Sequence, residues 1–161
     1  MHDHKPQAEH EWLRKLIGQW TFAGLMEMGP GEEPQTDTGT EEFAAFGEYW
    51  VRSSGVGQGP DGAPAQWSLS LGFDPWREKF VGNWVSSMGP HMFVYEGVLD
   101  AGRTVLTLDS EGPSMVDENT LARYRDSIEF LADDHWVLRS QTLGDDGAWT
   151  QFMEGHYRRT T

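Results

Sequence analysis

The chain of 161 residues contains no cysteine. Disulfide bonds, thiolate metal sites and cysteine nucleophiles are therefore excluded. Basic residues are also scarce, because 12 Lys and Arg stand against 26 Asp and Glu and give a formal net charge of −14. The largest basic clusters are two pairs, Arg14-Lys15 and Arg158-Arg159, which are too small to form a phosphate-binding stripe. We therefore expect neither nucleic acid nor a membrane surface as a partner.

Long apolar runs are absent as well. No stretch approaches the roughly 18 apolar residues that a membrane-spanning helix requires. The first residues, MHDHKPQAEHEW, are polar and charged, so we expect no secretory signal and a cytoplasmic location. The chain shows no Ser-His-Asp order, no phosphate-binding loop, no dinucleotide-binding glycine pattern and no HExxH. The sequence leaves open whether the protein is an enzyme.

What the chain does contain is a series of short strands and turns. Eight Trp, eight Phe, four Tyr and 19 Gly are spread along it, a composition that favours strands and tight turns. The predicted strands span residues 20–28, 39–46, 48–54, 66–73, 79–87, 91–99, 104–110, 120–131, 135–143 and 148–159. About ten strands with mostly short connections predict an all-β fold, a closed antiparallel up-and-down β-barrel, and a two-sheet sandwich is the alternative. Residues 9–161 form this single predicted domain, and residues 1–8 a predicted disordered tail.

Only residues 9–17 have a helical period. Their apolar side chains fall on one face of about two helical turns, and Gly18 follows where a glycine commonly ends a helix. Trp20 then opens the first predicted strand. We expect the short helix to cap one end of the barrel and Trp20 to plug the barrel from inside, because an open end would admit water to the core. Gly18 permits the sharp turn between them.

A helix followed by Gly-x-Trp resembles the start of calycin barrels, which include lipocalins, fatty-acid-binding proteins and nitrobindins. The stretches LIGQW, LGFDPWREKFVGNWVSSM, YEGVLD, RYRDSIEF and WTQFMEGHYRR are together similar to a bacterial family of unknown function with a calycin-like barrel. The resemblance implies an arginine from the last strand packed over Trp20 in a cation–π contact. Arg159 is the expected partner, since it shares a strand face with Tyr157, and Arg158 is the alternative. No activity can be carried over from that family.

A barrel of this size predicts a central cavity for a small, mostly apolar organic ligand. Trp84, Phe93, Tyr95, Met153 and Tyr157 are the expected lining, and loops 29–38 and 55–65 the expected entrance. The resemblance favours Arg125 as the residue that meets an anionic head group. Simple alternation along that strand opposes this, because Tyr124 and Ile128 indicate the inward face. The partner is then a small apolar or amphipathic molecule, and the sequence leaves open whether the barrels pair as homodimers.

An enzyme that uses the same cavity is the second hypothesis, of isomerase, cyclase or hydrolase type. Glu96 or Glu154 would act as the base and a tyrosine or histidine, such as His156, as the acid. Asp126 and Glu129 are further acid–base candidates, since both lie in an otherwise apolar strand. Such an enzyme would carry a cavity carboxyl group with a raised pKa beside a Tyr or His.

No cofactor is expected, although the resemblance to nitrobindins implies haem with His156 as its axial ligand as an alternative. A metal site is not expected either. If the GDDG turn forms a plain hairpin, His135 lies directly opposite His156 and offers two ligands. A bulge at Gly147 would slip the register by one residue and separate the pair.

Overall fold

The computed structural model of the chain describes residues 4–59 and 61–160. Within these residues the chain forms one α-helix, one turn of 3-10 helix and ten strands. Their bounds are α1 (Ala8–Leu13), η1 (Arg14–Leu16), β1 (Gly18–Met26), β2 (Gln35–Phe46), β3 (Trp50–Gln58), β4 (Pro64–Asp74), β5 (Lys79–Ser86), β6 (Gly89–Leu99), β7 (Val105–Pro113), β8 (Leu121–Ala132), β9 (His135–Leu143) and β10 (Trp149–Arg159). The segment predicted as a helix over 9–17 therefore begins as α1 and tightens into η1.

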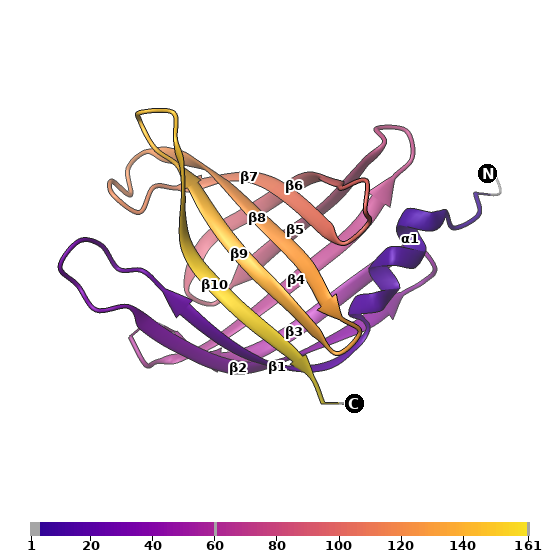
Figure 1. Cartoon of the computed structure of the whole chain (residues 1–161), viewed down its shortest axis with the longest axis horizontal. Coiled ribbons are helices and arrows are strands. Elements are labelled where there is room, and N and C mark those ends of the chain that lie inside the picture. The colour runs from indigo at the N-terminus through magenta and orange to yellow at the C-terminus, as the bar shows by residue number, and fades with distance from the viewer. Residues whose placement is uncertain (1–3, 60, 161) are drawn as a thin grey trace.

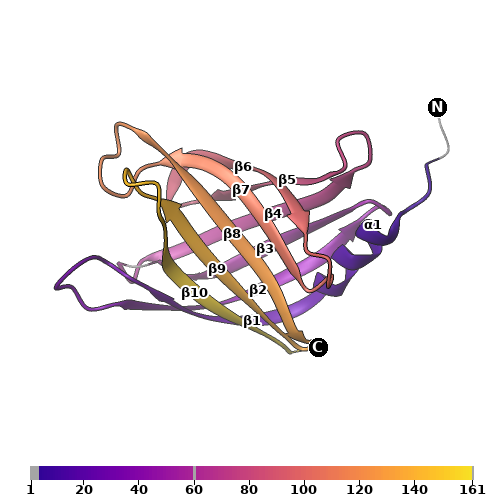
Figure 2. The same cartoon turned by 45° about the horizontal axis from the view of Figure 1, so that its top comes forward.

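The ten strands form one closed sheet. Each strand pairs antiparallel with its neighbours in sequence, and β1 pairs with β10 to close the barrel (Figures 1 and 2). Closure removes the unpaired edges that an open sheet would expose. The predicted closed antiparallel barrel of about ten strands with a short N-terminal helix is confirmed, and the alternative sandwich is wrong.

Aspartates at strand ends set the short connections. The Oδ1 atom of Asp100 accepts the backbone N–H groups of Thr104, at 2.8 Å, and Val105, at 3.0 Å. These backbone hydrogen bonds lower the pKa of Asp100. Asp74 likewise accepts the backbone N–H of Trp76 at 2.9 Å after β4. The carboxylates replace ladder hydrogen bonds where the chain reverses, which lets successive strands lie side by side.

Trp20 and Arg159 seal the end of the barrel beside α1. Trp20 is 1% exposed, and its Nε1 donates to the backbone oxygen of Leu16 at 2.8 Å. The Arg159 guanidinium lies 4.3 Å from the centre of the Trp20 ring and donates to the backbone oxygens of Ile17 and Lys15 at 2.7 and 2.9 Å. The cation–π contact that the resemblance implied thus forms with Arg159, which lies directly opposite Trp20 in the register of β1 and β10.

Helix α1 lies against this end, as Figure 1 shows. It buries Trp12 and Leu13, and Trp12 Nε1 donates to the backbone oxygen of Arg103 at 2.8 Å. His10 is also buried, and its Nε2 lies 3.0 Å from the backbone oxygen of Phe73. The turn to β1 uses Gly18, whose φ of 139° falls in the region that favours glycine. The helix is therefore fixed to the β4–β5 and β6–β7 sides of the barrel.

The predicted tail, residues 1–8, lies only partly within the described chain. Residues 1–3 fall outside the described residues. The backbone oxygen of His4 accepts a hydrogen bond from the Tyr49 hydroxyl, and α1 begins at Ala8.

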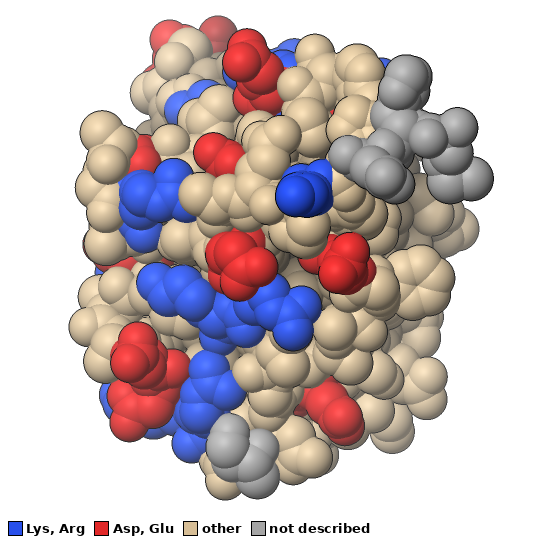
Figure 3. All heavy atoms as spheres, turned by 90° about the vertical axis from the view of Figure 1, so that its right-hand side faces the viewer, with Lys and Arg blue, Asp and Glu red and all other residues tan. Residues whose placement is uncertain are grey.

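Figure 3 views the end of the barrel that carries α1, and Lys and Arg side chains gather among Asp and Glu side chains on it. The two basic pairs of the sequence meet here, because η1 carries Arg14 and Lys15 and the guanidinium of Arg159 reaches the backbone of Lys15. Across the described residues, none of the helical segments has the length and apolar character needed to cross a bilayer.

Candidate functional site

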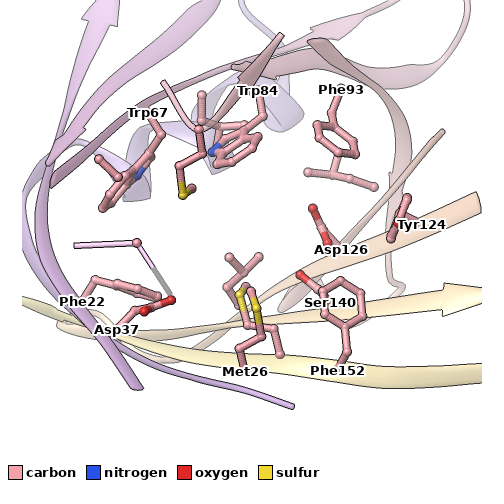
Figure 4. Close-up of a pocket in the computed structure, with 18 of the residues that line it drawn as sticks. Phe22, Met26, Asp37, Trp67, Trp84, Phe93, Tyr124, Asp126, Ser140 and Phe152 are labelled. Atoms are coloured by element: carbon pink, nitrogen blue, oxygen red, sulfur yellow. The ribbon is translucent and has the colours of Figure 1, made fainter. Parts of the chain in front are cut away.

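The strands enclose a cavity of about 450 Å³. Its lining reaches the connections β3–β4, β5–β6 and β7–β8, which in an up-and-down barrel lie at the end opposite α1. Figure 4 shows the inner side chains around an open space, with Trp67 and Trp84 on one side and Met26 and Phe152 on the other. The barrel is therefore packed at one end and hollow at the other.

The entrance differs in part from the prediction. Gln58, Gly59 and Ala65 of the predicted segment 55–65 line the cavity, whereas only Asp37 does so from segment 29–38. Residues 88–91 and Pro113 with Met115 contribute the rest of the rim. These shorter connections were not predicted because they do not differ in composition from ordinary turns.

Nine Phe, Trp and Tyr side chains line the cavity, and several of them meet edge to face. The ring centres of Trp84 and Phe93 lie 5.8 Å apart, those of Phe93 and Tyr124 5.8 Å, and those of Tyr124 and Phe152 5.9 Å. Such T-shaped pairs are the preferred arrangement of aromatic quadrupoles. The rings therefore hold one another upright around the cavity and present faces and edges to its contents.

Glycines on neighbouring strands make room for these rings. A Cβ atom at Gly55 would lie 2.2 Å from Nε1 of Trp67, and one at Gly155 would lie 2.2 Å from the Phe22 ring. Each glycine thus leaves the space that the neighbouring ring occupies, where a Cβ atom would collide with it. Some of the glycines in the sequence therefore shape the cavity, whereas others form the turns between strands.

Glu41 is a buried carboxyl group in the cavity wall. It is 3% exposed, and its Oε1 accepts hydrogen bonds from Trp67 Nε1 at 2.8 Å and from the Tyr157 hydroxyl at 3.0 Å. Burial raises the pKa of Glu41, and the hydrogen bonds from Ser53, Trp67 and Tyr157 oppose that rise. The carboxyl group is thus held by neutral donors in an apolar setting.

Asp126 is a second carboxyl group in the cavity, where Figure 4 shows its side chain pointing into the open space. The Tyr95 hydroxyl donates to Asp126 Oδ2 at 2.5 Å. Burial raises the pKa of Asp126, and its hydrogen bonds with Ser140 and Tyr95 oppose that rise. Burial and the nearby Asp126 charge raise the pKa of Tyr95 well above its usual value. A carboxyl group within hydrogen-bond reach of a tyrosine is the arrangement expected of an acid–base site.

Asp37 supplies a third carboxyl group, and burial raises its pKa. Its Oδ1 is buried and has no hydrogen-bond partner among the described residues. The sequence reading missed both Asp37 and Glu41 as site residues. Alternation backward from the apolar Phe43 places Glu41, Gly39 and Asp37 on one inward face, so the pattern was available for both. The predicted strand 39–46 left out Asp37 alone.

Five of the six residues predicted to bind a ligand line the cavity: Trp84, Phe93, Tyr95, Met153 and Tyr157. That they contact a ligand stays a prediction.

The sixth, Arg125, lies outside the barrel. Its Nε donates to Asp109 Oδ1 at 2.8 Å, and its guanidinium lies 4.2 Å from the centre of the Trp149 ring. Alternation along β8 explains the placement, because Tyr124 and Asp126 line the cavity and the residue between them points outward. The anionic head group that Arg125 was expected to meet thus has no such partner in the cavity.

The alternative catalytic residues also lie on the outer face. Glu96 follows the inward Tyr95 on β6 and is exposed. Glu154 pairs with Arg139, whose Nε lies 3.0 Å from Glu154 Oε1, and Arg139 also pairs with Glu129 at 2.7 Å. None of Glu96, Glu129, Glu154 and His156 is among the residues that line the cavity. Of the acid–base candidates from the sequence, Asp126 alone is part of the cavity wall.

His135 and His156 do meet, but in a different register from the one predicted. The plain hairpin would place them directly opposite each other, whereas His135 lies opposite Arg158 and His156 opposite Val137. One residue of slip occurs at the turn and another at a bulge between Gln151 and Met153. A shift of two residues returns side chains to the same face, so the pair becomes diagonal and His135 Nε2 lies 2.8 Å from His156 Nδ1.

These two histidines do not form a larger metal-ligand group. Within the described part of the chain, no cluster of three or more His, Cys, Asp or Glu is arranged to hold a metal ion. His156 also does not fit the haem alternative, because its ring lies outside the barrel beside Glu154 and His135. The histidine that does line the cavity, His91, has its Nε2 2.8 Å from the backbone oxygen of Glu111.

The chain belongs to a family described as a protein of unknown function (DUF1579), whose model matches residues 5–159. This confirms the predicted membership of a family of unknown function. No curated protein matches the chain.

Several solved structures share the fold of this chain. The structure of Rv2717c from M. tuberculosis is similar, with a TM-score of 0.63, 15% identity and coverage of 98% of this chain and 100% of that chain. The S-type phycobiliprotein lyase CPES from Guillardia theta has a TM-score of 0.65 and 14% identity, with 97% and 99% coverage. The barrel EF1p2_mFAP2b, bound to DFHBI, has a TM-score of 0.52 and 14% identity, with 95% and 100% coverage. At these identities the likeness establishes the fold.

Proposed function

We propose that this protein binds a small, mostly apolar organic molecule, with at least one aromatic ring, in the cavity of its barrel. The observation that carries the proposal is the cavity of about 450 Å³ whose wall includes nine Phe, Trp and Tyr side chains. Cavities of this size and character are typical of small-molecule sites. Proteins that bury large side chains for stability alone fill such a space, because an empty apolar cavity costs stability.

Two features of the wall support an aromatic ligand. Trp84, Phe93 and Tyr124 already stand in edge-to-face contact, so a flat ring that enters beside them gains the same quadrupole interactions. The similar barrel EF1p2_mFAP2b is bound to the small molecule DFHBI, which supports a small-molecule ligand for this barrel as well. A location in the cytoplasm and the extent of the domain stay predictions from the sequence.

Fluorescence titration with the neutral apolar dye Nile red tests the proposal. We expect saturable binding with a blue-shifted, brighter emission as the dye leaves water. Replacing the buried Ala65 by Phe should lower the dye affinity at least about tenfold, because the added ring fills part of the cavity. Gln66→Phe is the matched control, since Gln66 is the exposed neighbour on the same strand. Absence of dye binding, or equal affinity in Ala65→Phe and the parent, would overturn the proposal.

A second candidate is an enzyme that moves a proton in the same cavity. The burial of Asp126 beside the open space supports it, because burial raises the pKa of this carboxyl group and a desolvated carboxylate is a stronger base than one in water. Asp126 would accept a proton from a carbon next to a ligand carbonyl group, and the resulting acid would return a proton to the carbon of the enolate.

Deuterium exchange of 2-tetralone in heavy water, followed by NMR, tests the enzymatic candidate. We expect exchange at the carbon between ring and carbonyl to be faster with the protein present, and expect Asp126→Asn to remove the acceleration. Equal exchange rates in the parent and Asp126→Asn would contradict this candidate and leave the binding proposal intact.

A further inference from the structure

The cavity contains negative charge without a matching positive charge. Asp37, Glu41 and Asp126 line it, and no Lys or Arg is among its described lining residues. None of the ion pairs formed by the described residues includes any of the three carboxyl groups. Glu41 is buried, and Asp37 and Asp126 are partly buried. A desolvated carboxylate without a counter-charge is costly, so all three groups favour a proton or a cation supplied by a ligand.

Glu41 and Asp126 influence the same tyrosine in the cavity wall. The Tyr157 hydroxyl donates to Glu41, and the Tyr95 hydroxyl donates to Asp126. The pKa of Tyr157 is raised well above its usual value, mainly by burial and then by the charges of Glu41, Tyr95 and Asp126. The two carboxyl–tyrosine pairs are therefore close enough to interact electrostatically.

Asp37 carries an acceptor that the protein leaves unused. Its Oδ1 is buried without a hydrogen-bond partner among the described residues. Figure 4 shows Asp37 and Asp126 reaching the same open space from different sides, with Trp67 and Trp84 above. A buried acceptor facing a cavity indicates a ligand that brings a hydrogen-bond donor.

The aromatic wall adds a second attraction for positive charge. The faces of Trp and Tyr rings attract cations, and the effect is largest where water is excluded. The net charge of −14 draws cations toward the molecule as a whole, and a low-dielectric cleft concentrates such a field. Both effects oppose an anionic ligand.

We propose that the cavity selects an organic cation, an aromatic or otherwise apolar molecule with a protonated or alkylated nitrogen, which Asp126, Glu41 and Asp37 receive within the aromatic wall. This inference rests on the proposed binding function and specifies the ligand class. It reverses the expectation from the sequence, in which Arg125 was to meet an anionic head group. A carboxylate ligand such as a fatty acid would place its charge beside three acidic groups, with no Lys or Arg among the described lining residues.

Competition against Nile red with three matched naphthalene compounds tests the inference. The compounds are naphthalen-2-ylmethylammonium, naphthalen-2-ylmethanol and 2-naphthoate, which are cationic, neutral and anionic at neutral pH. We expect the ammonium compound to displace the dye at a concentration at least about tenfold lower than the alcohol. The carboxylate should be the weakest competitor. Equal potency of the ammonium compound and the alcohol, or a preference for 2-naphthoate, would overturn the inference.

Variants locate the origin of the preference. Asp126→Asn and Glu41→Gln remove one charge each at nearly constant volume, and each should reduce the preference for the ammonium compound over the alcohol several-fold. Glu42→Gln is the matched control, because Glu42 is the exposed neighbour of Glu41 on the outer face of β2 and removes the same charge. A preference that persists unchanged in both cavity variants would contradict the role of the carboxyl groups.

The outcomes separate the two proposals. If Nile red does not bind the parent protein, the proposed binding function fails. If the dye binds and the three competitors are equally potent, the binding function stands and the inference of a cationic ligand fails alone. If Glu41→Gln does not fold, Asp126→Asn decides the question, because Asp126 is only partly buried and its amide replacement can still accept from Tyr95.

Discussion

The two ends of the barrel use charged side chains in opposite ways. At the end closed by α1, the guanidinium of Arg159 lies over Trp20 and donates to the backbone oxygens of Asp133, Ile17 and Lys15, so its charge is engaged by the protein. In the open half, Glu41 and Asp126 accept hydrogen bonds from neutral groups only and have no basic partner among the described residues. The cation at the closed end is thus satisfied by the fold itself, whereas the acids of the cavity have no Lys or Arg partner in the described part of the chain.

The comparison predicts that substitutions at the closed end change stability and spare the cavity. Trp20→Ala should have the largest effect, because Trp20 is 1% exposed and packs edge-to-face against Trp136. We expect a loss of about 3–5 kcal/mol in the free energy of unfolding, the usual cost of truncating a buried tryptophan. Urea denaturation followed by circular dichroism measures it.

Trp76→Ala is the control for this experiment. The Trp76 side chain is 75% exposed in the turn after β4, so its loss should change the free energy of unfolding by no more than about 0.5 kcal/mol. Similar effects in the two variants would show that Trp20 does not close the barrel.

Arg159→Met should have the next largest effect. It removes the cation–π contact with Trp20 and the hydrogen bonds to Ile17 and Lys15, and we expect a loss of about 2 kcal/mol. Arg158→Met is the matched control, since Arg158 is the exposed neighbour on the same strand. The dye affinity of Arg159→Met should equal that of the parent, because Arg159 does not line the cavity. A change in dye affinity without a change in the free energy of unfolding would show that Arg159 acts on the cavity rather than on the closed end.

Much of the closed end could be predicted from sequence because its signals are local. Helical period, Gly18 and Trp20 lie within twelve residues of one another, and the position of Arg159 followed from the face it shares with Tyr157. The inward aromatics of β5 and β6 were found in the same way. The local sequence pattern was enough wherever alternation along one strand decides which side chains face inward.

The acidic half of the cavity was harder to predict because its groups come together through closure of the sheet. Glu41 meets Tyr157 only because β1 lies between β2 and β10, and the two residues are 116 apart in sequence. The resemblance placed Arg125 at the ligand, whereas alternation along β8 correctly indicates that Arg125 points outward. His135 and His156 still meet although the predicted register was wrong, because two slips of one residue each return both side chains to the same face of the sheet.

The smallest predicted effect is on the pH dependence of the free energy of unfolding, and it tests whether the cavity carboxyl group of Glu41 lacks a counter-charge. Burial raises the pKa of Glu41 above its ordinary value of 4.5, so the folded chain holds this proton more tightly than the unfolded chain. The contribution of Glu41 to stability is therefore fully present below pH 4.5 and is lost as the pH rises through the higher folded pKa. Glu41→Gln cannot ionise and lacks this loss.

Urea denaturation of the parent and of Glu41→Gln from acidic to weakly basic pH measures the difference. The free energy of unfolding of the parent, relative to that of the variant, should fall as the pH rises. Other titrating groups are common to both proteins and cancel in the comparison. Glu42→Gln should instead give a curve parallel to the parent, because Glu42 is exposed on the outer face. If the difference rises with pH, the carboxylate form of Glu41 is favoured by folding, and the cavity then already holds its own counter-charge.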